Sequence, residues 1–230
     1  MKLLKLKIAI VAIVSSSVSA MASDIPPSGS DISATASNAD LVLLGETIAN
    51  RNCVMCHGPS FQGYFVAPRL AGQRPQYIVN QIHNFVAHTR DNPYSQLYMW
   101  RASAKLEWTD PAGPQAVAAY LSTLEPKAAN DGHEEFIGAG QSLYAAGQQE
   151  ENVPACAACH GPNAVGSRNI PRLGGLSYFY LKRRLEQWAE GYHTSGAYPM
   201  PKVARNLSPD QIEALASYLS FIDYTREAFK

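Results

Sequence analysis

Apolar side chains recur along this chain of 230 residues with the spacing of one face of an α-helix, and few segments show the alternation of a half-buried strand. We expect three helices in each half of the chain. They are predicted at residues 41–50, 76–88, 115–124, 134–146, 177–190 and 209–222. An apolar fraction of 46% is ordinary for a globular protein, so the pattern predicts an all-α fold with a packed core.

The start of the last predicted helix is well defined. Ser208 stands at the N-cap, Pro209 at the first helical position and Gln211 where a capping box needs it. At the matching place in the first half, Gly113 and Pro114 interrupt the first turn. We therefore expect that helix to begin later than its counterpart.

The second half of the chain repeats the first. His57 and His160 lie 103 residues apart, and a Pro-Arg-Leu segment follows each of them at the same distance. Further along, residues 111–122 align with residues 209–220. A match of this length indicates an internal duplication. We predict a first domain at residues 40–126, a linker at residues 127–133 and a second domain at residues 134–230.

The N-terminus has the pattern of an export signal. Three lysines precede an apolar run, and small residues follow it, so residues 1–22 are predicted to be a signal peptide. It is cleaved after Ala20 or Ala22, or retained as an anchor. Residues 23–39 have the composition of a flexible leader. Cleavage after Ala22 leaves 16 of the 19 basic residues against 19 acidic ones, a net charge of −3, which argues against nucleic acid as a partner.

All four cysteines belong to two Cys-x-x-Cys-His motifs that end at His57 and His160. The cysteines are Cys53, Cys56, Cys156 and Cys159. A redox disulfide is typical of thioredoxin-like sites, but the expected βαβ surroundings are missing. Zinc needs four ligands, which two cysteines and an adjacent histidine supply awkwardly. The motif is also the attachment signal of c-type haem, and two copies in an exported chain favour two covalently bound haems.

A haem iron held by one histidine needs a sixth ligand or keeps an open site. Beyond the signal peptide three methionines remain, and Met55 lies between two cysteines at the haem edge. Met99 and Met200 follow His57 and His160 by 42 and 40 residues. A single methionine normally fills a core, but two at equivalent places favour His57/Met99 and His160/Met200 as axial pairs. The rival ligands form no matching pair in the repeat; they are His83, His88, His133 and His193.

The two motifs, the two Pro-Arg-Leu segments, the two methionines and the terminal "AYLS" and "SYLS" helices follow one another in the same order in both halves. In this order the chain resembles the dihaem cytochrome c4 family over roughly residues 41–224. The resemblance implies two tandem class I cytochrome c domains in the bacterial periplasm. It also implies that the carbonyls of Pro68 and Pro171 accept the Nδ1–H of the motif histidines, and that Arg69 and Arg172 pair with haem propionates.

Two axial side chains on each iron leave no site for a substrate, and methionine ligation favours ferrous iron. We therefore expect an electron carrier rather than an enzyme. Its partners would be redox proteins, namely an electron donor and a terminal oxidase or reductase, and a peripheral contact with a membrane is left open. Two alternatives remain. One is a dihaem enzyme, peroxidase-like or thiosulfate-oxidising, and the other is an electron-transfer subunit of a dehydrogenase complex.

One position distinguishes the two halves. Arg90 of the first repeat corresponds to His193 of the second. An arginine keeps its charge, whereas a histidine can lose its proton near neutral pH. If both side chains lie near their haems, the potential of the C-terminal haem should fall as pH rises through the titration of His193.

Overall fold

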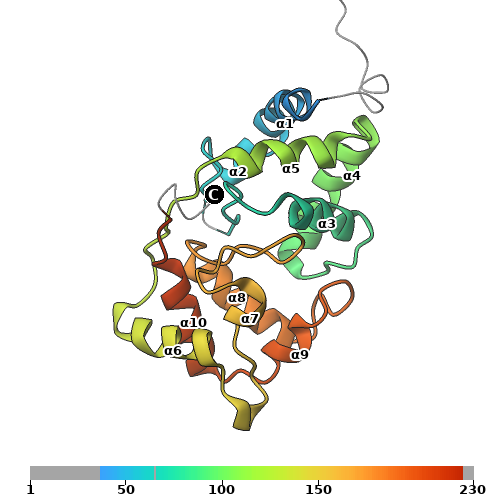
Figure 1. Ribbon diagram of the computed structural model, residues 1–230. Coiled ribbons are helices and arrows are strands. Elements are labelled where there is room, and N and C mark those ends of the chain that lie inside the picture. Colours follow the sequence, from blue (N-terminus) through green and yellow to red (C-terminus); the bar gives the residue numbers. More distant parts are fainter. Residues whose placement is uncertain (1–36, 65, 225–230) are drawn as a thin grey trace, which may run out of the picture.

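The fold is described from a computed structural model, which places residues 37–64 and 66–224 (Figure 1). The predicted signal peptide and most of the predicted leader lie outside these residues. The described chain is helical, and its extended pairings are isolated bridges, so it contains no strand. Figure 1 shows one helical half in blue and green and another in yellow and red. The predicted all-α fold with two helical repeats is confirmed.

The first half contains three helices near the expected positions. They are α1 (Asn38–Asn52), α3 (Pro75–Val86) and α5 (Gly113–Thr123). Three further segments were not expected. They are α2 (Val54–His57), the π-helical turn η1 (Ser95–Met99) and α4 (Trp100–Thr109), which continues directly from η1.

The second half follows the same order. The expected helices are α6 (Ile137–Ala146), preceded by the 3-10 turn η2 (Glu134–Phe136), then α8 (Tyr178–Ala189) and α10 (Pro209–Ser220). The short segments that were not expected are η3 (Gln149–Glu151), α7 (Ala157–His160) and α9 (Met200–Ala204). They lack the length over which an apolar period can be recognised.

Two helices begin at capping boxes, which the local sequence is sufficient to predict. The capping box at Ser208 forms as predicted, because the Gln211 backbone N–H donates to Ser208 Oγ at 3.2 Å and the Gln211 side chain accepts from Ser208 N–H at 2.8 Å. Ser37 and Asp40 form the same device at α1. The helix therefore begins at Asn38, inside the segment that was predicted to be leader.

Helix α5 begins later in its repeat than its counterpart, as expected. It begins at Gly113, whereas α10 begins at Pro209, which aligns with Pro111. Pro114 lies in the first turn of α5 and does not interrupt it. Proline is tolerated there because the first helical N–H groups have no partner within the helix. The carboxylate of Asp110 also accepts a hydrogen bond from Ala112 N–H at 2.9 Å, which stabilises the turn before the helix.

Each half is built around one close helix crossing. Gly45 of α1 lies against the backbone of α5, where an added Cβ would be 1.9 Å from the carbonyl oxygen of Ala116. Gly140 of α6 lies against α10 in the same way, with an added Cβ 2.1 Å from the Ala214 oxygen. An apolar core forms beside each crossing. The crossing brings the first and last helices of each repeat together and closes the half around its motif.

The two halves are joined by the segment between α5 and η2, and they also contact each other directly. The Gln73 side chain pairs with the backbone of Arg172, donating to its carbonyl at 3.1 Å and accepting from its N–H at 2.8 Å. Arg74 Nε donates to the Val165 carbonyl at 2.7 Å. The Pro-Arg-Leu segments therefore lie at the junction between the halves.

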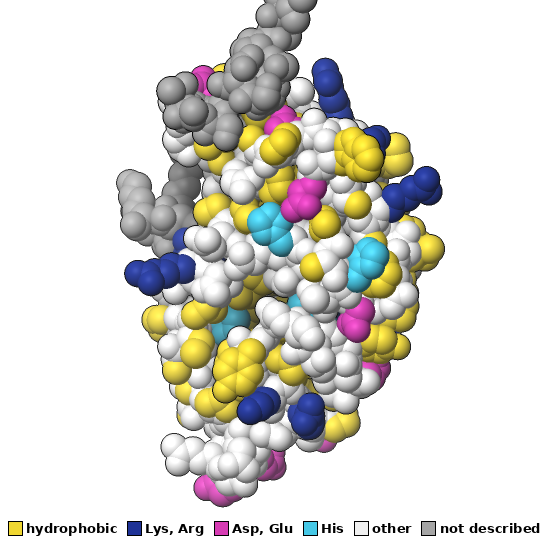
Figure 2. Space-filling model, turned by 90° about the vertical axis from the view of Figure 1, so that its right-hand side faces the viewer, with side chains coloured by type: hydrophobic (Ala, Val, Ile, Leu, Met, Phe, Trp, Pro, Cys, Tyr) yellow, Lys and Arg dark blue, Asp and Glu magenta, His cyan; other side chains and the backbone are white. Residues whose placement is uncertain are grey.

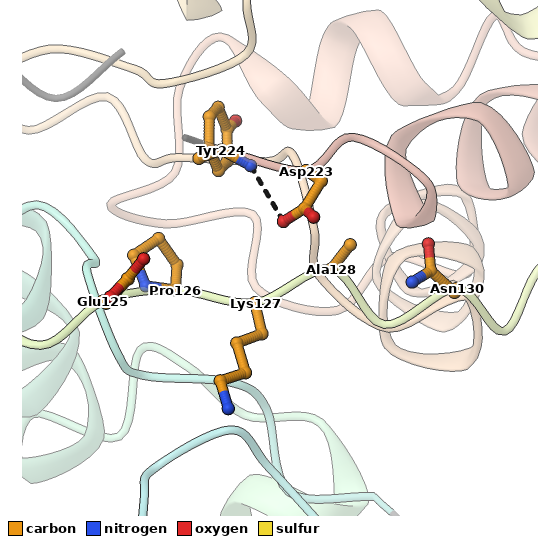
Figure 3. A pocket seen from close by; sticks show the side chains of 7 residues that line it. All are labelled: Glu125, Pro126, Lys127, Ala128, Asn130, Asp223 and Tyr224. Atoms are coloured by element: carbon orange, nitrogen blue, oxygen red, sulfur yellow. Dashed lines mark hydrogen bonds between the residues drawn. The ribbon is translucent and has the colours of Figure 1, made fainter. Parts of the chain in front are cut away.

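A pocket of about 620 Å³ lies beside the joining segment (Figure 3). Its wall combines residues 125–128 and 130 with the C-terminal end of the described chain, where Tyr224 N–H donates to Asp223 Oδ1 at 3.0 Å. It contains neither cysteines nor motif histidines. The candidate chemistry of this protein lies elsewhere.

Candidate haem sites

The two motifs fold into the same one-turn helix. In α2 the His57 N–H donates to the Cys53 carbonyl at 2.9 Å, and in α7 the His160 N–H donates to the Cys156 carbonyl at the same distance. A glycine ends each turn, and Gly58 has a φ of 81°. This single turn places both thiols and the histidine of a motif on one short element, which suits attachment of one flat group.

The thiols are unpaired and weakly acidic. All four described cysteines are free, with Cys56 and Cys159 exposed and the other two partly buried. Burial, and to a lesser extent the neighbouring thiol, raises the pKa of Cys53 to about 11. Burial likewise raises the pKa of Cys156 to about 11. A redox cysteine has its pKa lowered instead. The described residues also contain no group of three or more His, Cys, Asp or Glu that could hold a metal ion, so neither a thioredoxin-like site nor zinc is supported.

The motif histidines are buried and oriented. His57 Nδ1 lies 2.8 Å from the carbonyl oxygen of Pro68, and His160 Nδ1 lies 3.0 Å from that of Pro171. A carbonyl only accepts, so Nδ1 carries the proton and Nε2 is the free ligand atom. Burial lowers the pKa of both rings, partly opposed by the carbonyl bond. Each site therefore presents a neutral imidazole, the form that binds iron.

The candidate sixth ligands differ in their surroundings. Met200 begins α9, is partly buried and packs against the second core together with Cys156. Met99 ends η1 and is partly buried, but it lies outside the corresponding apolar cluster of the first half. Met55 is 91% exposed, as expected for a residue between the two cysteines.

Three of the four rival histidines interact with side chains outside the motifs. His83 lies 3.3 Å from Glu107, and His133 lies 3.5 Å from Glu213. The ring of His88 stacks on Trp100 at a centroid distance of 3.8 Å. None of these contacts directs a ring towards a motif.

The two arginines predicted to meet propionates have different environments. Arg172 is completely buried and donates to the carbonyls of Gly174 and Ala71, the latter at 3.0 Å. Burial lowers its pKa to about 10. Its Nε has no protein partner. Arg69 is partly buried and donates to Gln62 Oε1 and to the Lys127 carbonyl, both at 3.2 Å. Pairing of either arginine with a propionate stays a prediction.

A buried polar cluster at the junction was missed in the sequence. Arg90 donates to Gln81 Oε1 at 2.7 Å within its own half and to the Tyr180 hydroxyl at 3.3 Å across the junction. In the second half, Arg184 Nη2 lies 2.7 Å from His193 Nδ1. The repeat offset of 103 residues matches Gln81 with Arg184 and Arg90 with His193. Each half thus has one arginine at these two positions, but at a different one of the two. Applying the repeat offset to Gln81 as well as to Arg90 would have revealed this in the sequence.

The expected titration of His193 near neutral pH is wrong. Burial, followed by the positive charges of Arg184 and Arg90, lowers the pKa of His193 to about 3. A guanidinium can only donate, so His193 Nδ1 accepts and Nε2 carries the proton. The ring is neutral throughout the physiological range, and it supplies no pH-dependent charge to either site.

Four buried N–H groups in this cluster and its surroundings lack a protein partner. They are Arg90 Nε, Arg172 Nε, Trp188 Nε1 and His193 Nε2. Unsatisfied buried donors are costly and call for an acceptor. Haem propionates are carboxylates that would meet this need. The free thiols, the neutral imidazoles and these orphaned donors therefore fit two covalently bound haems.

Comparison with known proteins agrees with the site. The cytochrome c family matches residues 42–125 and 137–222, so both halves are cytochrome c domains. Cytochrome c4 of Thiocapsa roseopersicina is 33% identical over 183 residues, which cover 76% of this chain and 89% of that protein. A thiosulfate dehydrogenase electron acceptor of Stutzerimonas stutzeri is 35% identical over 182 residues, covering 76% and 81%. The solved cytochrome c4 of Acidithiobacillus ferrooxidans has a TM-score of 0.68 at 29% identity, covering 74% and 98%.

These two cytochrome c domains define a c-type cytochrome with one haem in each half. The chain belongs to the cytochrome c4 family. It binds two covalently attached haems and transfers electrons, and its partners are redox proteins.

Proposed function

We propose that this protein is a periplasmic carrier of single electrons and not an enzyme, with His57/Met99 and His160/Met200 as its axial pairs. The observation that carries the proposal is the repeated donor set, a neutral buried histidine oriented by a proline carbonyl and a methionine of its own in each half. Haem iron supplies a reversible one-electron change when it is bound. The protein side chains attach the haem, orient its ligands and enclose it.

The protein side chains keep the two sites closed and rigid. Thioether bonds from two cysteines per site would prevent loss of the group, and the carbonyls of Pro68 and Pro171 prevent rotation of the histidine rings. A methionine on the opposite side would exclude exogenous ligands. Little movement is then needed when an electron arrives or leaves, which suits a carrier.

The junction explains why two carriers share one chain. Bonds from Gln73 to Arg172 and from Arg90 to Tyr180 connect the halves through buried groups. The two sites are thereby held in one fixed relation. An electron that enters at one half would leave through the other without a second docking event.

A thiosulfate-oxidising enzyme is a specific candidate for the electron donor. The support is the similarity to the Stutzerimonas stutzeri protein, whose name is thiosulfate dehydrogenase electron acceptor. Reduction of this chain by such an enzyme in the presence of thiosulfate would support this partner. Thiosulfate oxidation by this chain alone, with the enzyme left out, would contradict the proposed role as a carrier.

The main test is a redox titration of the purified exported protein, followed by optical spectra and by mass spectrometry. We expect the mass of the chain plus two haem groups, two one-electron waves and slow, weak binding of carbon monoxide to the reduced protein. Rapid binding of one carbon monoxide per chain would show an open iron and favour the enzyme alternative. Free thiols at Cys156 and Cys159 would contradict the second site.

A further inference from the structure

The segment that leads to Met200 is held by the other half of the molecule. This segment, residues 190–199, connects α8 to α9, and we call it the second methionine loop. The backbone N–H of His193 donates to Asp91 Oδ1 of the first half at 2.6 Å. Asp91 follows α3 in the corresponding segment of the first repeat. A carboxylate of one half therefore binds the backbone of the loop that precedes the proposed ligand of the other half.

A second contact between the halves lies further along the same loop. Gly196 has a φ of 77°, and an added Cβ would lie 3.1 Å from Oδ1 of Asn84, a residue of α3. Glycine suits both this backbone conformation and the close approach. Asn84 and Asp91 together support the loop, and we call them the α3 seat. The loop before α9 lies beside α3 in Figure 1, and the space-filling view of this side shows the two halves as one continuous body (Figure 2).

The second methionine loop has few backbone bonds of its own. In the described chain the backbone N–H groups of residues 194–198 donate to no backbone carbonyl. The next such bond runs from Met200 N–H to the Ala197 carbonyl at 2.9 Å. The N–H of His193 is thus the last bonded backbone donor before Met200, and its acceptor belongs to the first half. A loop with so few restraints should move when this bond is lost.

The repeat shows that this contact is not shared by both halves. The offset of 103 residues places Thr194 opposite Asp91, so the second half has no carboxylate at this position. The corresponding segment of the first half contacts the second through a side chain instead, because Arg90 donates to the Tyr180 hydroxyl at 3.3 Å. The contact between a carboxylate and a loop backbone therefore runs only from the first half to the second.

We propose that Asp91, in the first half, is a positioning residue for Met200, the axial ligand proposed for the second haem. The inference rests on the axial pairs of the proposed function. By accepting the His193 N–H, the carboxylate fixes the start of the stretch that ends at Met200 and limits the movement of the thioether. Ligation in the second half then depends on the first half, which gives the joined domains a property that two separate carriers lack.

The Asp91 carboxylate also has an electrostatic effect, which must be separated from positioning. Burial and the charge of Arg90 lower the pKa of Arg184, and the charge of Asp91 opposes this shift. Asp91→Asn removes the charge but keeps an oxygen that can accept the His193 N–H. Asp91→Ala removes both. A positioning role predicts that asparagine can replace aspartate, whereas an electrostatic role predicts that the two variants behave alike.

The experiment uses the holoprotein and follows methionine ligation by the long-wavelength ferric band and by the rate of carbon monoxide binding to the reduced protein. Met200→Ala identifies the signals of the second haem. Asp91→Ala should weaken the band of the second haem and raise its rate of carbon monoxide binding at least about tenfold, as expected for loss of one charge-assisted hydrogen bond. Asp91→Asn should stay within about threefold of the unaltered protein, because a neutral hydrogen bond remains.

Asp110→Ala is the matched control. Asp110 is another carboxylate of the first half that accepts a backbone N–H, from Ala112 at 2.9 Å, but it does so within its own half. Its removal should leave the second haem unchanged. Asn84→Ala is a second variant of the α3 seat, and alanine is favourable in a helix. Loss of its contact with Gly196 should raise the carbon monoxide rate of the second haem about threefold.

An unchanged second haem in both Asp91→Ala and Asn84→Ala would overturn the proposal. So would equal changes at both haems, which would show a general loosening of the fold. An Asp91→Asn variant as impaired as Asp91→Ala would also overturn it, since the charge would then be responsible. A Met200→Ala variant that keeps the full methionine band of both haems would refute the axial pair itself, and the proposal with it. The two kinds of failure are therefore distinguishable.

Discussion

A single hydrogen bond determines how each motif histidine can act. The carbonyls of Pro68 and Pro171 lie within 3.0 Å of the Nδ1 atoms of His57 and His160, which leaves Nε2 for the iron. Such a contact fixes the tautomer and the orientation of the ring. The proposed partner on the other side is a methionine in each half. Its role can be tested one residue at a time.

Replacement of Met99 or Met200 by alanine should remove the long-wavelength ferric absorption of one haem and leave that of the other. The potential of the altered haem should fall by more than about 59 mV, which is a tenfold change in the one-electron equilibrium, because the thioether favours ferrous iron. Optical redox titration measures both effects. Met55→Ala is the control and should change neither, because Met55 is 91% exposed. An intact band in Met99→Ala would refute the assignment for the first half.

His193 should make the fold sensitive to acid rather than tune a potential. Its pKa is lowered from 6.5 to about 3 in the folded protein. Below pH 6.5 the unfolded chain takes up a proton that the folded protein does not. The free energy of unfolding therefore decreases as the pH is lowered. At pH 4.5 the loss is about 3 kcal/mol. His193→Asn keeps a side chain that tolerates the positive φ of 52° at this position and should lose less stability.

The measurement is urea unfolding of the oxidised protein and of His193→Asn from pH 7 to pH 4.5. The difference in the free energy of unfolding between the two proteins should change by about 3 kcal/mol over this range. Parallel pH profiles would show that His193 titrates normally in the folded state, contrary to its buried place beside Arg184.

At the scale of helices, the close crossings of α1 with α5 and of α6 with α10 set the geometry of each half. They need glycine because the partner backbone occupies the space of a side chain at Gly45 and Gly140. The same contact in both repeats indicates that the duplication preserved the crossing itself. Helix α4, by contrast, is longer than α9 and carries surface residues that its counterpart lacks.

Gly45→Ala and Gly140→Ala should each lower the free energy of unfolding by about 3 kcal/mol or more, because the new methyl group overlaps a backbone carbonyl and the helices must move apart. Gly138→Ala is the matched control on α6. No atom lies within 4 Å of its added Cβ, so it should stabilise the protein by about 0.5–1 kcal/mol through helix propensity. Urea unfolding of the holoproteins compares them. Equal stability of all three variants would mean that the crossings are looser than described.

The junction between the halves holds the whole molecule together. At this junction the two repeats differ in which position of a buried pair carries the arginine. Arg90 pairs with Gln81, whereas Arg184 pairs with His193. Both arginines are buried, and both contribute to the electrostatics of the same cluster. Each half thus contributes one positive charge to the cluster, but the charge lies at Arg90 in the first half and at the non-equivalent position Arg184 in the second.

This exchange predicts a rescue. His193→Arg alone should destabilise the protein by about 3 kcal/mol, because it places a second buried cation beside Arg184. Adding Arg184→Gln reproduces the pair found in the first half and should restore most of the loss. Thermal unfolding of the two variants, compared with Arg184→Gln alone, gives the coupling between the positions. A double variant as unstable as the sum of its single substitutions would show that the two pairs are not equivalent.

The sequence by itself determined the features that depend on neighbouring residues. The haem motifs need only cysteines and a histidine within one turn, and the cap at Ser208 needs only Gln211 three residues later. The duplication is visible because it repeats such local signals, and the long helices because an apolar face recurs over several turns. These features predicted the helical fold, the number of haems and the ligand candidates.

The tertiary structure alone decided which charges are buried and which apolar groups are exposed. His193 is neutral because it is buried and because Arg184 and Arg90 approach it from other elements. Trp108 is exposed because the inward side of α4 is occupied by Ser103 and Leu106. Burial and electrostatic shifts are sums over groups that are distant in sequence, so no local pattern contains them. Residue spacing could therefore propose the ligands of this cytochrome, but only the packed chain could show the buried junction between its halves.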